Sequence, residues 1–304
     1  MKKQKKGPAS VVGLCFDETA WALAEIGPFG KSQVLRQFFQ SPTQSREDQE
    51  TNAILLKNTV TQLGLRNRRS VVLLPAKAYQ VFLIERPNVP ESEMKSAIRW
   101  KISEYSDIPV EEAVVDFIEL PHAKNADNPS LCYAVIAKKQ TIDELVMQVS
   151  QAGLSVEAVD ISQSALRYIA LKLEETNEGQ ALLHVQAKKS HLILFQDRSL
   201  IMMREIEMGL EDLQQQNSEQ ALASEIQRSL DYCSSKLSHH DVSRLLITPL
   251  VEKQPSLLSH LSNALGLPVR EIVFSEFLSN LNDNELKKEN MTTLAIGAAL
   301  RNLN

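Results

Sequence analysis

Apolar and polar positions alternate along the first part of the chain in patterns that predict strands and a helix. The segment VVGLCFDETAWALAEI at 11–26 has apolar runs on both sides of an acidic turn, which is typical of a β-hairpin. A third apolar run covers 34–39, and apolar residues at helical spacing fill 50–63 before Gly64 ends that helix. The run VVLLP that follows is typical of a buried central strand, so the order is three strands, a helix and a strand.

A different pattern over about 79–161 predicts a compact α+β insert. YQVFLIER alternates as a strand, and a helix over about 91–106 begins after Pro90 and ends before Pro109. The strands AVVDFIEL and LCYAVIAKK follow, then a helix over about 141–152. The strand SVEAVDIS closes this unit in the predicted order.

The chain after a polar boundary at 174–179 repeats the order of its first part. Three strands are predicted within 181–209, and a long helix over about 218–237 precedes the strand SRLLITP. A helix over about 252–265, the strand PVREIVF and a helix over about 290–303 complete this half.

Two halves of the order β-β-β-α-β-α, without obvious sequence identity, predict a duplicated α/β architecture. We expect a disordered basic tail at 1–10, a first unit at 11–176 that contains the insert, and a second unit at 177–304.

Charge and composition narrow the classes of partner. The formal net charge is −5, so there is no overall basic field and we expect no nucleic-acid partner. No window approaches the about 18 apolar residues of a membrane-spanning helix, so we expect a soluble chain that reaches a membrane only through a partner. Cys15, Cys132 and Cys233 are odd in number and far apart, which is typical of a reducing cytoplasm.

Three segments carry a resemblance to a known family: PESEMKSAIRWKISEYSDIPVEEAVVDF in the insert, EIQRSLDYC in the long helix and TLAIGAALR at the end. In this order the chain, over about 11–301, resembles the PilM-type proteins of bacterial type IV pilus assembly, above all those of mannose-sensitive haemagglutinin (MSHA) pilus systems. The resemblance implies an actin-like ATPase (ribonuclease H-like) duplicated fold. It also implies a cytoplasmic protein, peripheral to the inner membrane, that binds the cytoplasmic N-terminal tail of a PilN-like inner-membrane partner and acts with other pilus assembly components.

The resemblance also implies a first phosphate loop at 13–19, and this chain departs from its pattern. PilM-type proteins read approximately G-L-D-I-G here, with an aspartate that organises a metal and a glycine that lets the backbone approach phosphate. Gly13 and Leu14 match, but the aspartate position holds Cys15 and the turn glycine is Asp17. Glu18 and Thr19 complete the turn, so a carboxylate lies where a phosphate would bind.

A second phosphate loop and an adenosine loop, implied in the same way, show similar losses. His184 and Gln186 replace the second aspartate and its glycine, although the Lys188, Lys189 and Ser190 that follow are able to hold a phosphate. The Gly-Gly pair of the adenosine loop is replaced by Thr248 and Pro249, and proline removes an N–H group.

Without its two carboxylates the site lacks hard oxygen ligands for Mg²⁺. We therefore expect no catalytic residue, no bound metal, no cofactor and no hydrolysis, with weak ATP binding left open. Cys15 is expected to be an inert core thiol, and His184 and His191 a pair in a sheet rather than metal ligands. We interpret His239-His240-Asp241 as a solvated helix end, and no common enzyme motif occurs.

The insert helix suggests a surface for a peptide. Apolar residues on more than one face predict a partner-peptide groove that includes Ile84, Ile98, Trp100 and Tyr105, and the alternative is ordinary core packing. The leading hypothesis is a non-catalytic scaffold of pilus assembly. One alternative is an ATP-binding conformational switch. Another is the actin-like part of a type II secretion L-type protein, which would have a transmembrane helix after the fold, whereas this sequence ends at Asn304.

Overall fold

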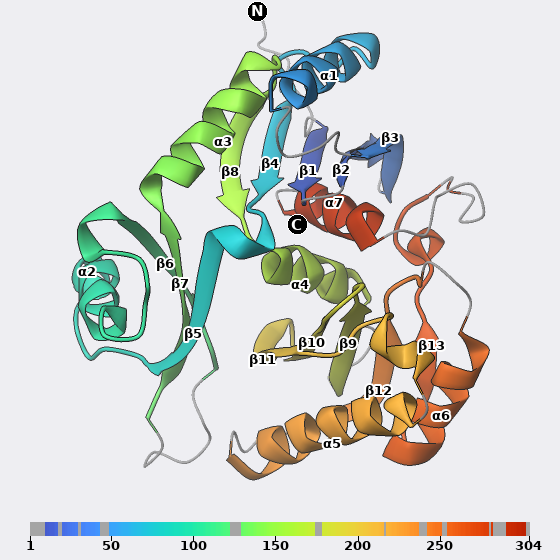
Figure 1. The fold of residues 1–304 in the computed structure, drawn as a ribbon. Coiled ribbons are helices and arrows are strands. Elements are labelled where there is room, and N and C mark those ends of the chain that lie inside the picture. The colour runs from blue at the N-terminus through green and yellow to red at the C-terminus, as the bar shows by residue number, and fades with distance from the viewer. Residues whose placement is uncertain are drawn as a thin grey trace, which may run out of the picture.

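The computed structural model shows two similar α/β halves with a small domain at one side (Figure 1). It describes residues 10–17, 20–29, 32–42, 49–121, 129–173, 178–215, 217–236, 242–250, 254–279, 281 and 290–301. The predicted basic tail lies outside the described residues except for Ser10, and so do Glu18, Thr19 and the His239-His240-Asp241 group.

The first half contains a five-stranded sheet of order β3-β2-β1-β4-β8. The strands β1, β2 and β3 form an antiparallel meander, whereas β4 and β8 run parallel to β1. The helix α1 and the strands have the bounds β1 Val11–Phe16, β2 Ala20–Phe29, β3 Ser32–Pro42, α1 Gln49–Gln62, β4 Arg69–Leu73 and β8 Ser155–Asp160. Strand β1 is buried almost throughout, as its run of apolar residues predicts.

The second half repeats this topology in a sheet of order β11-β10-β9-β12-β13. Helices α5 and α6 cover one face of it and contribute buried leucines and isoleucine to a core of their own. The bounds are β9 Gly179–Val185, β10 Ser190–Gln196, β11 Ser199–Ile206, α5 Ser218–Lys236, β12 Val242–Ile247, α6 Pro255–Leu265 and β13 Val269–Glu271. The duplicated architecture predicted from the order of elements is confirmed.

Two helices, α4 (Ser162–Leu173) and α7 (Asn290–Leu300), pack against each other between the sheets (Figure 1). Their side chains form one core with inward-facing residues of both sheets. The close approach needs a small residue, because a Cβ atom on Gly297 would lie 2.4 Å from the Ala165 carbonyl oxygen. The apolar ending of the chain is therefore a helix buried on all its sides.

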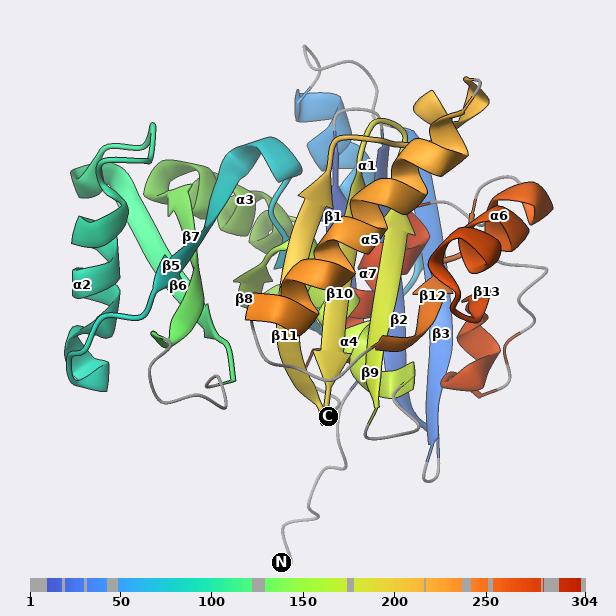
Figure 2. The same ribbon diagram turned by 90° about the horizontal axis from the view of Figure 1, so that it is seen from below.

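The insert has its own three-stranded antiparallel sheet, of order β5-β7-β6, which lies beside the two halves (Figure 2). Helix α2 packs on the face away from the halves, where the even-numbered side chains of β5 join its core. The bounds are β5 Tyr79–Glu85, α2 Glu91–Ile102, β6 Ala113–Glu119, β7 Leu131–Lys138 and α3 Lys139–Gln151. Short 3₁₀ helices cover Ala76–Ala78, Val110–Glu112, Asp212–Gln214 and Phe274–Glu276.

Two predictions about the insert are wrong in detail. The strand SVEAVDIS does not close the insert, because β8 pairs in parallel with β4 and is the edge of the first large sheet. Hydrophobic pattern alone does not identify the sheet to which a strand belongs. Helix α2 ends at Ile102 rather than near 106, where the Ser103 N–H donates to the Trp100 carbonyl and tightens the last turn.

Candidate functional site

Gly13 lies where the resemblance places the start of a phosphate loop, but its neighbours are helix α7. A Cβ atom at this position would lie 2.0 Å from the Ala295 carbonyl oxygen and 2.5 Å from the Ala299 nitrogen. The missing side chain thus allows β1 to contact α7, and the contact occupies the space beside the glycine.

The two chemical positions of the first loop are also engaged within the protein. Cys15 is buried and its Sγ donates to the Met291 carbonyl at 3.3 Å, while burial raises the pKa of its thiol. The Asp17 N–H donates to the Ala20 carbonyl at 2.9 Å, and Asp17 Oδ1 accepts the Ala20 N–H at 2.7 Å. The opening turn is therefore a hairpin closed by its own aspartate.

His184 occupies the second aspartate position and is fully buried. Its Nδ1 is 2.8 Å from the Thr248 hydroxyl, and its ring stacks on His191 with centroids 6.5 Å apart. The two histidines are direct partners of β9 and β10, so the predicted sheet pair is confirmed. Burial, with a smaller effect of His191, lowers the pKa of His184 to about 3, so this side chain is neutral in the folded protein.

The second turn is covered by the segment that follows β11. The Gln186 N–H donates to the Lys189 carbonyl at 2.8 Å, and the Gln186 carbonyl accepts the Leu210 N–H at 2.8 Å. The Ser190 hydroxyl donates to the Met208 carbonyl at 2.7 Å, whereas Lys188 is exposed. Two of the three groups predicted to hold a phosphate, Lys189 and Ser190, therefore have partners within the protein.

The two positions at which the resemblance implies metal-organising aspartates carry no oxygen ligand for Mg²⁺. Neither Cys15 nor His184 offers an oxygen ligand, and both side chains are buried in neutral form. At the adenosine-loop position the Thr248 N–H donates to the Leu183 carbonyl at 2.9 Å, and Pro249 is buried beside it. The structure brings His184 of β9 and Thr248, the residue after β12, together in a buried polar contact.

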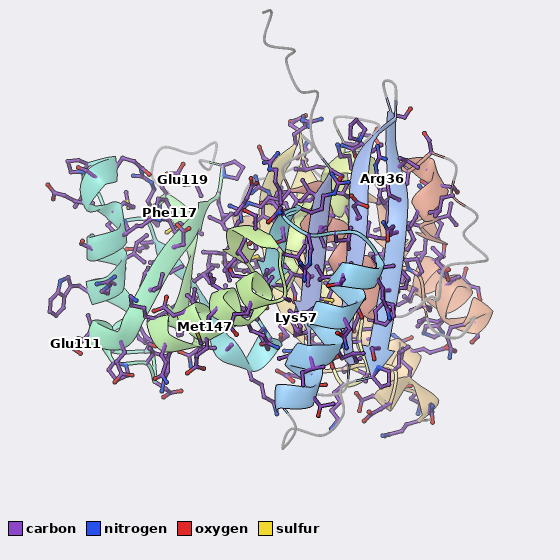
Figure 3. The ribbon with its side chains drawn as sticks, turned by 90° about the horizontal axis from the view of Figure 1, so that it is seen from above. Arg36, Lys57, Glu111, Phe117, Glu119 and Met147 are labelled. Atoms are coloured by element: carbon purple, nitrogen blue, oxygen red, sulfur yellow. The ribbon has the colours of Figure 1, made fainter. Side chains whose placement is uncertain are left out.

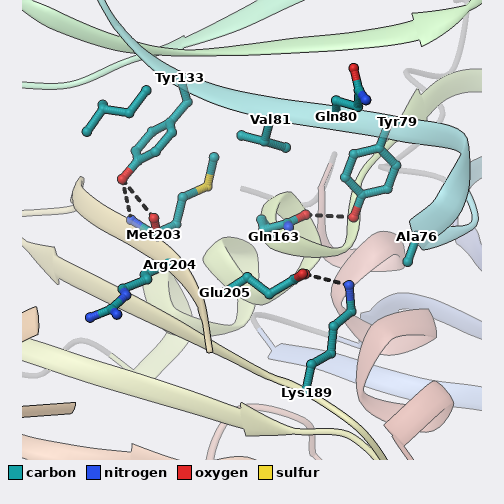
Figure 4. Close-up of a pocket in the computed structure, with 11 residues that line it drawn as sticks. Ala76, Tyr79, Gln80, Val81, Tyr133, Gln163, Lys189, Met203, Arg204 and Glu205 are labelled. Carbon is teal, nitrogen blue, oxygen red and sulfur yellow. Dashed lines mark hydrogen bonds and ion pairs between the residues drawn. The ribbon is translucent and has the colours of Figure 1, made fainter. Parts of the chain in front are cut away.

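A cleft of about 410 Å³ lies between the insert and the second half of the molecule (Figure 4). Strands β5 and β7 of the insert form one wall. Strand β11, the turn before β10 and the start of α4 form the other. Its lining residues are Ala76, Tyr79, Gln80, Val81, Leu83, Tyr133, Gln163, Lys189, Met203, Arg204 and Glu205.

Hydrogen bonds fix the two walls of this cleft. The Tyr133 hydroxyl donates to the Met203 carbonyl at 2.8 Å and accepts the Met203 N–H at 2.9 Å (Figure 4). The Tyr79 hydroxyl donates to Gln163 at 2.8 Å, and Lys189 pairs with Glu205 across the polar end. Burial raises the pKa of both tyrosines to about 12, so both hydroxyls stay protonated as donors.

The four residues predicted to form a peptide groove do not line this cleft or share a surface. Ile84 and Ile98 are buried between α2 and the insert sheet, so the core-packing alternative holds for them. Trp100 is 71% exposed and Tyr105 is 67% exposed, and neither lines the cleft. Helical spacing gives the faces of α2, but it does not tell which side of the insert meets the second half.

The sequence did not identify the residues that line the cleft, because they come from elements that are far apart in the chain. The alternation of YQVFLIER separates its odd positions, among them Val81 and Leu83, from the even ones that face α2. Nothing local in the sequence places these odd positions opposite Met203 and Glu205.

A second hollow, of about 480 Å³, lies on the outer side of the insert and α3. Glu111 and Met147 are among its lining residues, and Figure 3 shows both on the side of the molecule that carries the insert. It contains no residue predicted to have a function.

The two sheets, with their crossing helices between them, define a protein of the actin-like ATPase fold. The structure is similar to the PilM-PilN type IV pilus biogenesis complex, with a TM-score of 0.76 and 19% identity over 97% of this chain and 98% of that chain. It is also similar to a Bacteroides thetaiotaomicron protein with an actin-like ATPase fold and unknown function, with a TM-score of 0.54 and 12% identity over 97% of this chain and 98% of that one. At sequence identities of 19% and 12%, these similarities show that the fold is shared and nothing more.

Sequence comparison defines the family. The model of the type IV pilus assembly protein PilM family matches residues 42–221, which is more than half of the chain, and the chain belongs to this family. A comparison with curated proteins finds no match. In the described part of the chain, no helix combines the length and the apolar content needed to cross a bilayer.

Proposed function

We propose that this PilM-family protein is a non-catalytic scaffold of MSHA-type pilus assembly, corresponding to MshI. In this proposal it works at the cytoplasmic face of the inner membrane and binds the cytoplasmic N-terminal tail of a PilN-like, MshJ-like membrane protein. The family membership and the fold shared with a PilM-PilN complex support the role in pilus assembly and the PilN-like partner.

The cleft between the insert and the second half is the observation that carries the proposal. Val81, Leu83 and Met203 give it apolar side chains, whereas Lys189 and Glu205 supply charges of both signs at one end. A peptide binds well to such a site, because apolar anchors supply affinity and polar groups fix its direction. Leu83 is 41% exposed and so offers apolar surface for a ligand to cover.

The residues at the nucleotide positions support a role without ATP hydrolysis. Cys15 and His184 stand where the family has metal-organising aspartates, and both are buried and neutral. The opening turn is closed by Asp17, and the second turn is covered by the chain near Leu210. In our proposal the actin-like fold therefore supplies a rigid frame for the cleft, and neither a nucleotide nor a metal is required.

Peptide titration tests the location of the site. The probe is a synthetic peptide of the cytoplasmic N-terminal segment of the PilN-like protein from the same genome, labelled for fluorescence anisotropy. Leu83→Arg should weaken its binding at least about tenfold, because it puts a long charged side chain on the apolar wall. Ile54→Arg is the matched control, since Ile54 is an exposed aliphatic residue on α1. Equal affinity of both variants, or loss only in Trp100→Ala, would place the site elsewhere.

Titration with Mg-ATP tests the absence of nucleotide binding. We expect no saturable binding below about 1 mM, which corresponds to a binding free energy of about −4 kcal/mol. A dissociation constant tighter than about 10 μM would instead favour the ATP-binding switch, because millimolar ATP would then stabilise the fold by several kcal/mol.

A further inference from the structure

The cleft is bordered by the edge strands of two different sheets. Strand β5 is an edge of the insert sheet, and β11 is an edge of the sheet in the second half. Both contribute lining residues, from Tyr79 to Leu83 on one side and from Met203 to Glu205 on the other (Figure 4). An edge strand presents backbone N–H and C=O groups that an extended peptide is able to pair with.

Strand β11 is already engaged at the centre of its edge. The Tyr133 hydroxyl binds both the N–H and the carbonyl of Met203, so it takes the place of one peptide unit there. An added strand along β11 would have to break both of these hydrogen bonds. This edge is therefore the less available of the two.

Strand β5 has a different pattern. The Arg86 N–H donates to the Ser130 carbonyl, which shows that the backbone of Arg86 faces β7. In an antiparallel pair, successive residues direct their backbone N–H and C=O groups alternately toward the partner strand and away from it. Counted back from Arg86, the backbone groups of Val81 and Leu83 therefore point to the free edge. Among the described residues, no turn or side-chain hydrogen bond uses the backbone of these two residues, and Lys101 Nζ binds the next such carbonyl, that of Glu85, at 3.0 Å.

The cleft also follows this edge. Val81 and Leu83, whose backbone groups point to the free edge, both line the cleft (Figure 4). The free edge of β5 at Val81 and Leu83 therefore lies within the cleft.

We propose that the partner's tail binds as an additional strand on the free edge of β5, with main-chain hydrogen bonds to Val81 and Leu83. This inference rests on the proposed function and adds the mode of recognition. One face of the added strand meets Leu83 and Met203, so alternate residues of the tail are apolar. Lys101, on the Glu85 carbonyl, marks the end of the pairing edge.

A pair of substitutions at one position separates backbone pairing from side-chain contact. Leu83→Pro removes the N–H that faces the cleft but leaves the ladder with β7, because proline is tolerated on the free side of an edge strand. Leu83→Ala removes the same side chain and keeps the N–H. We expect Leu83→Pro to bind the tail peptide about tenfold more weakly than Leu83→Ala, with similar melting temperatures. Equal binding by the two folded variants would overturn strand addition.

A peptide scan on the unaltered protein keeps the test independent of folding. The same synthetic tail is N-methylated at one residue at a time, which removes one N–H and blocks strand pairing on that side. We expect losses of about tenfold or more at every second residue of the bound stretch and small losses between them. Binding without this period of two would overturn strand addition and leave the proposed function intact, whereas failure of the unmodified tail to bind at all would refute both.

Discussion

Acidification should destabilise this fold through the buried pair His184 and His191. Their rings stack at an interplanar angle of 8°, and His184 Nε2 and both ring nitrogens of His191 have no hydrogen-bond partner among the described residues. Burial lowers the pKa of His184 to about 3. Burial also lowers the pKa of His191, to about 4, although nearby Glu205 favours its charged form and Lys189 opposes it.

The sign and size of the effect follow from linkage between protonation and folding. An unfolded histidine has a pKa near about 6.5, so below that pH the unfolded chain binds protons that the folded protein does not. Above pH about 6.5 both histidines are deprotonated in the folded and the unfolded protein, so they do not lower the free energy of unfolding. As the pH falls from there toward the folded-state pKa values, the free energy of unfolding decreases. At pH about 5 each histidine lowers the free energy of unfolding by about 2 kcal/mol, so the pair lowers it by about 3–4 kcal/mol.

Urea unfolding followed by circular dichroism, at pH about 7 and about 5, measures this loss. The double variant His184→Gln/His191→Gln should be less stable than the parent at the higher pH, because it disturbs the contact with Thr248. Its free energy of unfolding should nevertheless change by about 3 kcal/mol less than that of the parent between the two pH values. His260→Gln is the control, since His260 lies partly exposed on α6.

The same change with pH in the double variant and the parent would refute the reasoning. It would mean that these histidines are protonated in the folded protein or that other groups dominate its acid response. A flattened profile in His260→Gln alone would place the pH-sensitive group on α6.

Two further substitutions test the contacts around the site. Gly13→Ala should lower the free energy of unfolding by about 3 kcal/mol or more, because the new Cβ would overlap the α7 backbone at Ala295, and a melting temperature close to that of the parent would contradict this packing role. Tyr133→Phe should cost about 1–3 kcal/mol by leaving both backbone groups of Met203 without their shared partner, and unchanged stability in thermal unfolding would show that water replaces the hydroxyl.

The sequence alone determined the elements and their repetition. Apolar alternation gives the strands of each half, and the apolar segment TLAIGAAL lies in a predicted helix, which the structure contains as α7. The replaced loop residues Cys15, Asp17 and His184 are also visible in the sequence, once a family resemblance indicates where the loops lie. These features are local, so a short window of residues contains the information that specifies them.

The tertiary structure decided which elements meet. SVEAVDIS has the pattern of a strand in any sheet, and only its parallel pairing with β4 removes it from the insert. The cleft depends on contacts such as that of Tyr133 with Met203, 70 positions apart in the chain. Trp100 and Ile98 look equally suited to a groove in sequence, but packing of α2 on the insert sheet buries one and exposes the other. Periodicity gives the faces of an element, whereas the partner of each face depends on long-range packing of the whole chain.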